Sequence, residues 1–256
     1  MPGADDDAVS TGETLSLKDG TVVEIWETAD NTRYQLPDGS VILEIDKPAF
    51  YAELPEDRPY PGSLLPGADH GFDELTEDVQ TAIRDYCLAL PPRYDLATQL
   101  ERARHNYEKY GQDTVYHPFH MMWRYYPCAE GDNVLYVMTE TEGLKDEWST
   151  DSEFITTAFD KTTGEVIPPE DLFACSPEEL AEFMVRRSGL SLEDKMQEMI
   201  EKFDLQYLVI FPGQVHLWYP EGTLTDQPPA KYWLTFDNCE DLLTLFHPWS
   251  RPYETQ

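Results

Sequence analysis

The chain has 256 residues, with 18 lysines and arginines against 50 aspartates and glutamates, and so a formal net charge of −32 at pH 7. This charge disfavours nucleic acids and anionic membranes as partners, because both would be repelled over a long range, whereas a cationic partner would be attracted. Since 41% of the residues are hydrophobic, the chain has enough apolar surface to fold and is not a disordered acidic protein. Its length is that of one large domain or two small ones.

The N-terminal residues 1–12 are predicted to form a disordered acidic tail, which contains the run Asp5-Asp6-Asp7. They have neither the basic start nor the apolar stretch of a secretory signal, and no apolar run approaches the ~20 residues of a membrane-spanning helix. We therefore expect no transmembrane segment in this chain. A cytoplasmic location is expected if the chain is complete as given, and an extracytoplasmic one if a signal or anchor has been removed.

Residues 13–50 are predicted to form an N-terminal β-hairpin region. Apolar and polar residues alternate over 21–27, which is the period of a half-buried strand. Two more strands, 33–36 and 40–45, flank Pro37-Asp38-Gly39, and the Asp-Gly pair is typical of a tight hairpin turn.

Residues 51–150 are predicted to form a first α+β subdomain. Apolar residues three or four apart predict a helix from about Asp73 to Leu90 and a second from Asp95 to Tyr110. The period then changes to two, which predicts strands over 119–126 and 134–140 around the turn Gly131-Asp132-Asn133.

Residues 151–250 are predicted to form a C-terminal α+β subdomain, and residues 251–256 a tail. We expect a strand at 153–159, a hairpin turn at 160–165 in which Gly164 takes a positive φ, and helices that begin at Ser176 and Ser191. A hairpin through Gly213, a strand at 232–236 and a short helix at 239–246 follow. The predicted fold class is α+β, with antiparallel sheets each packed on one face by helices, in two small subdomains plus the hairpin region.

Motifs for nucleotide binding, metalloproteases and nucleophile elbows do not occur in the sequence. His117 and His120 lie three apart on a predicted strand, where they point to opposite faces and cannot share a metal ion. We therefore predict no catalytic residue, no metal site, no cofactor and no enzymatic activity. The cysteines form no Cys-x-x-Cys pair, and both two disulfides and buried free thiols are compatible with Cys87, Cys128, Cys175 and Cys239.

Tyrosines and tryptophans, which suit interfaces, make up 15 and 6 of the residues. They concentrate in two predicted strands, so one hypothesis is an exposed aromatic face that docks a protein or a glycan. The alternative is that these side chains fill the core. The candidate binding residues are Trp123, Tyr125, Tyr126, His216, Trp218 and Tyr219, and the turn glycines Gly39, Gly164 and Gly213 are assigned a structural role.

The order of these C-terminal motifs resembles a known family. The block from Phe159 to Phe173, two helices, the hairpin from Tyr207 to Pro220 and a last strand and helix are similar to the C-terminal domain of RsiV-type lysozyme-sensing anti-sigma factors, which also occurs beside peptidoglycan deacetylase domains in Gram-positive bacteria. The chain departs from that family between two sheet strands, where only Gly143 matches a Gly-Gly-Ala-His-like element. The resemblance implies a domain of otherwise unknown function with a binding role at the cell envelope.

Three functions follow as hypotheses. The first is a non-enzymatic, envelope-associated binding module that recognises a cationic protein such as lysozyme, or a cell-wall component. The second is a hydrolase of cell-wall glycan or peptide, with a site assembled from dispersed histidines and carboxylates. The third is an acidic cytoplasmic protein whose partner, like its oligomeric state, the sequence does not specify.

Overall fold

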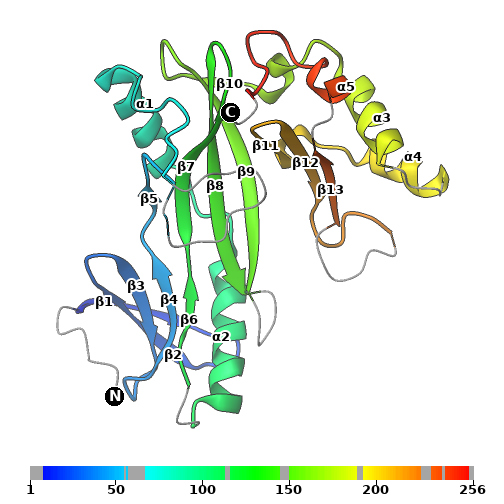
Figure 1. The fold of residues 1–256 in the computed structure, drawn as a ribbon. Coiled ribbons are helices and arrows are strands. Elements are labelled where there is room, and N and C mark those ends of the chain that lie inside the picture. The colour runs from blue at the N-terminus through cyan, green and yellow to red at the C-terminus, as the bar shows by residue number, and fades with distance from the viewer. Residues whose placement is uncertain are drawn as a thin grey trace. The chain divides into compact units, whose positions relative to one another are not determined.

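The computed structural model describes residues 8–54, 56, 67–112, 116–144, 150–188, 193–225, 232–237 and 240–253 (Figure 1). The described strands form three sheets, and the helices pack against them. The α+β class predicted from the sequence is therefore confirmed. None of the described helices is both long and apolar enough to cross a membrane.

The chain groups into two compact units, and each unit is assembled from three separate segments. The first contains residues 1–49, 88–124 and 140–153, and the second contains residues 50–87, 125–139 and 154–256. The subdomains predicted from the sequence are consecutive ranges, and that division remains a prediction. The two units are described separately below.

The first unit is built on a sheet with the strand order β1-β2-β3-β4-β6. Its strands are β1 (Val9–Ser16), β2 (Val22–Glu27), β3 (Asn31–Gln35), β4 (Val41–Asp46) and β6 (Phe119–Met121). The predicted hairpin is present, because β3 and β4 are antiparallel and the N–H of Gly39 donates to the carbonyl of Leu36 at 2.8 Å.

One pairing in this sheet differs from the predicted antiparallel arrangement. β4 and β6 are parallel, with Leu43 opposite Phe119. Parallel neighbours need a long connection between them, and here more than seventy residues separate the two strands in the chain. Local periodicity carries no information on the direction in which such a distant strand returns.

A strand also forms where a disordered tail was predicted. β1 begins at Val9 and pairs with β2 through a bulge between Ser10 and Thr14. Its side chains are almost all exposed, so it has no apolar periodicity to reveal it. Main-chain pairing and a hydrogen bond from the Thr11 hydroxyl to the carbonyl of Ile25 (2.9 Å) hold it in place.

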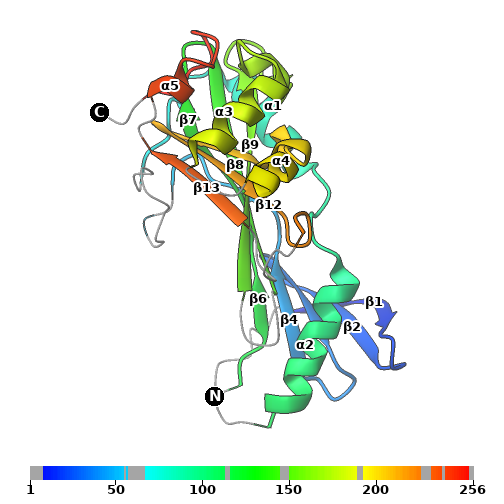
Figure 2. The same cartoon turned by 90° about the vertical axis from the view of Figure 1, so that its right-hand side faces the viewer.

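The helix α2 (Leu96–Tyr110) covers one face of this sheet (Figure 2). Its Leu100 and Ala103 are buried in one cluster with Ile42 and Leu43 of β4. Asp95 caps the helix by accepting a hydrogen bond from the N–H of Thr98 at 3.3 Å. The helix predicted over 95–110 is confirmed.

The second unit holds two sheets. The larger has the order β10-β9-β8-β7-β5, and four of its strands also contribute residues to the first unit. The smaller has the order β11-β12-β13. The strands are β5 (Ala49–Phe50), β7 (Trp123–Glu130), β8 (Val134–Leu144), β9 (Thr150–Asp160), β10 (Val166–Ile167), β11 (Leu208–Phe211), β12 (Gln214–Tyr219) and β13 (Tyr232–Asp237).

The helices of this unit are α1 (Glu77–Leu88), α3 (Pro177–Arg187), α4 (Glu193–Glu201) and α5 (Glu240–Leu243), with short 3-10 turns η1 (Pro169–Leu172) and η2 (Leu205–Tyr207). α3 and α4 lie on one side of the smaller sheet (Figures 1 and 2). α3 starts at the predicted serine with a complete capping box, since Ser176 and Glu179 each accept a hydrogen bond from the other's N–H. α1 begins four residues later than predicted, and Ser191 lies outside the described residues.

The residues just after 250 are part of the fold rather than a free tail. The N–H of Tyr253 donates to the carbonyl of Glu130 at 2.8 Å, and the Arg251 guanidinium donates to the carbonyl of Leu243 at 2.9 Å. Pro252 is buried. The acceptors of these hydrogen bonds are backbone carbonyls, so the pattern of side chains in the sequence does not predict them.

Candidate functional site

The predicted aromatic docking face is not exposed. Trp123, Tyr125, Tyr126, Trp218 and Tyr219 each retain 5% or less of their accessible surface, and His216 is half-buried. Side chains without accessible area cannot form a docking surface, so this hypothesis is corrected to its alternative, in which the aromatics fill the core.

The neighbouring residues Tyr125 and Tyr126 show why the strand pattern did not predict burial of the aromatic side chains. Successive residues of a strand point to opposite faces of its sheet, and both of these side chains are buried. Both faces of β7 are therefore covered. Two other aromatics have polar tips that bind backbone carbonyls: the indole N–H of Trp218 donates to Phe154 at 3.1 Å, and the Tyr219 hydroxyl donates to Met199 at 2.9 Å.

The three glycines assigned to turns all have positive φ angles, of 87° at Gly39, 74° at Gly164 and 66° at Gly213. In the turn that joins β9 to β10, the N–H of Gly164 donates to the carbonyl of Asp160 at 2.8 Å. The predicted hairpin turn thus occupies residues 160–165.

Among the described residues, no group of three or more histidines, cysteines and carboxylates could hold a metal ion. Cys87, Cys128 and Cys175 are free thiols, and Cys239 lies outside the described residues. Burial raises the pKa of the Cys87 thiol to about 12, so it stays protonated and unreactive at neutral pH.

One histidine lies against a carboxylate. His120 Nε2 in β6 is 2.5 Å from Asp46 Oδ1 in β4, and this hydrogen bond raises the pKa of His120. His120 is half exposed, and the pair fastens two strand ends of the first sheet. No nucleophilic side chain is hydrogen-bonded to this pair among the described residues, so the hydrolase hypothesis gains no geometric support from it.

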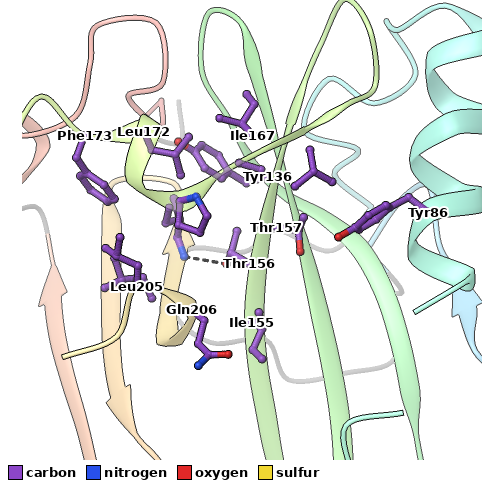
Figure 3. A pocket seen from close by; sticks show the side chains of 15 residues that line it. Tyr86, Tyr136, Ile155, Thr156, Thr157, Ile167, Leu172, Phe173, Leu205 and Gln206 are labelled. Carbon is purple, nitrogen blue, oxygen red and sulfur yellow. Dashed lines mark hydrogen bonds between the residues drawn. The ribbon is translucent and has the colours of Figure 1, made fainter. Parts of the chain in front are cut away.

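The second unit contains a pocket of about 200 Å³ that sequence reasoning did not find (Figure 3). It lies where β9, β10 and β11 meet the turns η1 and η2. None of its lining residues is a histidine, a cysteine, a carboxylate or a cation. The lining consists of Tyr86, Tyr136, Ile155, Thr156, Thr157, Ala158, Val166, Ile167, Pro169, Leu172, Phe173, Leu205, Gln206, Leu208 and Ile210.

The pocket follows the edge of β9 rather than one of its faces. Four successive residues, 155–158, line it, although neighbouring side chains of a strand point to opposite faces. Contacts identify both faces. On one face, the Thr156 hydroxyl accepts a hydrogen bond from the N–H of Ile210 in β11 at 3.0 Å. On the other, Tyr86 of α1 packs edge-on against Phe159 with the ring centroids 5.4 Å apart.

The same two faces are visible in the close-up view. Figure 3 shows Leu172, Leu205 and Gln206 on the side of β11, and Tyr86 reaching from α1 towards Thr157. The pocket is thus lined from both faces of β9. Two of its lining residues, Tyr86 and Val166, are exposed large hydrophobic side chains, with 40% and 37% of their surface accessible.

Polar groups inside the pocket are mostly engaged already. The Tyr136 hydroxyl donates to the carbonyl of Ser250 at 2.5 Å, and burial raises its pKa above the ordinary value for tyrosine. This hydroxyl therefore stays protonated, and it is not placed to act as a base at neutral pH. What remains for a ligand is apolar surface, the hydroxyls of Tyr86 and Thr157, and the backbone along the edge of β9.

Acidic residues follow the pocket's lining along the chain. Asp85 precedes Tyr86, Glu165 precedes Val166, and Glu170 and Asp171 lie between Pro169 and Leu172. All four are exposed, and none of them forms an ion pair among the described residues. Four exposed carboxylates that form no ion pair among the described residues therefore lie within one residue of the pocket's lining in the sequence.

Comparison with known proteins gives only structural likenesses. No protein-family description matches the sequence, and no curated protein matches it. The structure is similar to a DUF3298 family member from Bacteroides fragilis, with a TM-score of 0.40 and 11% identity, covering 94% of this chain and 92% of that one. It is also similar to a DUF3298 family protein from Pseudomonas aeruginosa PAO1, with a TM-score of 0.40 and 13% identity, covering 98% and 99%. That family name denotes a domain of unknown function, so the likeness assigns no activity to this chain.

Proposed function

We propose that this protein is a non-enzymatic binding module whose partner is a cationic protein of the kind that lysozyme represents. The observation that carries the proposal is the charge: 50 acidic residues against 18 basic ones on a chain that folds. Such a field attracts a cationic partner and raises its association rate. The proposal includes that the protein acts outside a Gram-positive cell, at the cell envelope.

The distribution of the acidic residues supports it. Asp73, Glu74, Glu77 and Asp78 lie exposed within and just before the first turn of α1. Together with the acids that follow the pocket's lining, they leave several parts of the second unit with charges that no described residue neutralises. Folding alone does not require such an excess, because net self-repulsion destabilises a compact state.

The chemistry of the pocket supports binding rather than catalysis at that place. Its lining offers apolar side chains and hydroxyls but no acid–base pair. A site of this composition recognises a partner by shape and burial of apolar surface.

Calorimetric titration of the protein with hen lysozyme tests the proposal. We expect binding at both about 50 mM and about 150 mM NaCl, weaker at the higher salt because exposed charges are screened. Succinylated lysozyme, which has the same fold with its lysine charges reversed, is the matched control and should not bind. Absence of binding at the lower salt would contradict the proposal. Binding that disappears at the higher salt would reduce it to nonspecific attraction.

A further inference from the structure

The short strand β10 covers only part of the outer edge of β9. β10 pairs with β9 only at Phe159 and Ala158. At the turn, the N–H of Asp160 donates to Glu165, so the backbone groups of Asp160 point to the outer edge. In a strand this direction alternates, and the backbone groups of Ala158, Thr156 and Phe154 point the same way.

A separate contact verifies this alternation. The carbonyl of Phe154 accepts a hydrogen bond from the indole of Trp218, which belongs to β12 and not to the neighbouring strand β8. Between Phe154 and Ala158 stands Thr156, whose side chain lines the pocket. None of the hydrogen bonds found among the described residues uses its outward N–H and C=O. A donor and an acceptor of the main chain are thus presented side by side.

The size of the pocket fits one side chain. A cavity of roughly 150 Å³ with apolar walls holds a benzene molecule, and this pocket measures about 200 Å³. Sites for drug-sized molecules and cofactors measure roughly 300–1,000 Å³. The dimensions therefore match a phenylalanine or leucine side chain, with Tyr86 and Val166 as the apolar rim.

Three features carry the proposal: the incomplete pairing of β9 with β10, the volume of the pocket and its apolar rim. From them we propose that the edge of β9 at Thr156 receives an extended basic segment of the partner protein. This segment pairs with the Thr156 backbone and inserts one apolar side chain into the pocket. Addition of a strand to a sheet edge supplies affinity through the main chain, and the pocket supplies specificity. The exposed acids Asp85, Glu165, Glu170 and Asp171 supply the complementary charge for basic residues on either side of the anchor. This inference rests on the proposed function, because it locates where a cationic protein is bound.

Two labelled peptides provide the test, acetyl-Lys-Lys-Thr-Phe-Thr-Lys-Lys-amide and the same peptide with serine in place of phenylalanine. Both carry the same charge, so their difference reports the anchor alone. Fluorescence anisotropy with the native protein should show the phenylalanine peptide binding at least about tenfold more tightly, as expected for burial of one aromatic ring. In ¹⁵N-labelled protein the amide of Thr156 should shift with the phenylalanine peptide.

Val166→Asp and Val22→Asp form a matched pair of variants. Both valines are exposed hydrophobic residues, but Val166 lines the pocket and Val22 lies on β2 of the first unit. Each change adds one negative charge. Val166→Asp should abolish the preference for phenylalanine while keeping the affinity for the serine peptide, which also shows that the variant folds. Val22→Asp should keep the preference.

Several outcomes overturn the inference. Equal affinities for the two peptides would do so, as would a preference for phenylalanine that survives in Val166→Asp. Sedimentation showing a dimer that Val166→Asp dissociates would assign the edge to a second copy of this chain instead. If lysozyme binds at physiological salt but the peptides bind equally, this inference fails and the proposed function stands. If neither lysozyme nor either peptide binds, both fail.

Discussion

Two stretches of strand edge in the described part of the chain, the outer edge of β1 and the part of β9 that β10 does not pair, differ in chemistry. β1 is the end strand of the first sheet and is almost wholly exposed, with polar side chains and a bulge between Ser10 and Thr14. The edge of β9 before Ala158 is instead enclosed by apolar side chains of the pocket. Bulges and polar residues discourage pairing with other chains. The comparison therefore suggests that β1 is protected from such pairing, whereas β9 retains the features that permit it.

The two edges should differ most in the free energy of unfolding that is lost when one contact to each edge is removed. Trp218→Ala deletes a buried ring and the hydrogen bond to the carbonyl of Phe154 on β9, and should lower the free energy of unfolding by about 3–5 kcal/mol. Thr11→Ala removes an exposed hydrogen bond from β1, with an expected loss below about 0.5 kcal/mol. Urea denaturation measures both, and similar losses would show that the β9 edge is no better supported than β1.

Glycines at the two edges allow a second comparison with matched backbones. Gly164, in the turn between β9 and β10, and Gly12, in the bulge of β1, have φ angles of 74° and 77°. A methyl group at Gly164 would lie 3.0 Å from the side chain of Ala82, whereas at Gly12 nothing lies within 4 Å. We expect Gly12→Ala to cost about 1 kcal/mol, from the backbone alone. Gly164→Ala should cost more, and equal losses would show that packing against α1 is not limiting.

The smallest effect concerns the opposite edge of the first sheet, where His120 of β6 meets Asp46 of β4. The hydrogen bond to Asp46 and the charges of Asp46, Glu44 and Glu142 raise the pKa of His120 above its ordinary 6.5, and partial burial opposes them. Because the folded pKa is the higher one, this stabilisation is complete below the unfolded pKa of about 6.5 and is lost as the pH rises through the folded value.

Urea denaturation between pH 5 and 9 of the native protein and of His120→Gln measures that effect. The difference between the two proteins should shrink as the pH rises. Asp46→Asn, which removes the partner of His120, is the control, and in that background the change His120→Gln should show no such trend. A difference that stays constant across this range would show that the ion pair does not hold β6 to β4.

Much of the fold followed from local signals. Asp95, Ser176 and the Pro37-Asp38-Gly39 turn act within a few residues of chain, and the helices and hairpin that they predict are present. Neither β1 nor the parallel return of β6 could be predicted in this way. β1 lacks apolar periodicity, and β6 is specified by a partner strand more than seventy residues away.

The candidate site was harder to predict for a physical reason. Alternation along β7 and β12 indicates strands, but it does not reveal that a second layer covers the other face, as it does at Tyr125 and Tyr126. The pocket is lined from α1, β8, β9, β10, β11 and both 3-10 turns, and each contributes ordinary core residues. In the sequence, only the acidic residues between Pro169 and Leu172 mark the position of the pocket. They do not stand out, because the whole chain has a net charge of −32.

The interleaving of the two units has a consequence for how this architecture can be inherited. The C-terminal hundred residues supply only one of the three segments of the second unit, and residues 50–87 and 125–139 complete it. A gene fragment that encodes these hundred residues alone would therefore lack β7, β8 and α1. We therefore expect transfer of this fold to another protein to require the whole interleaved stretch rather than the C-terminal segment alone.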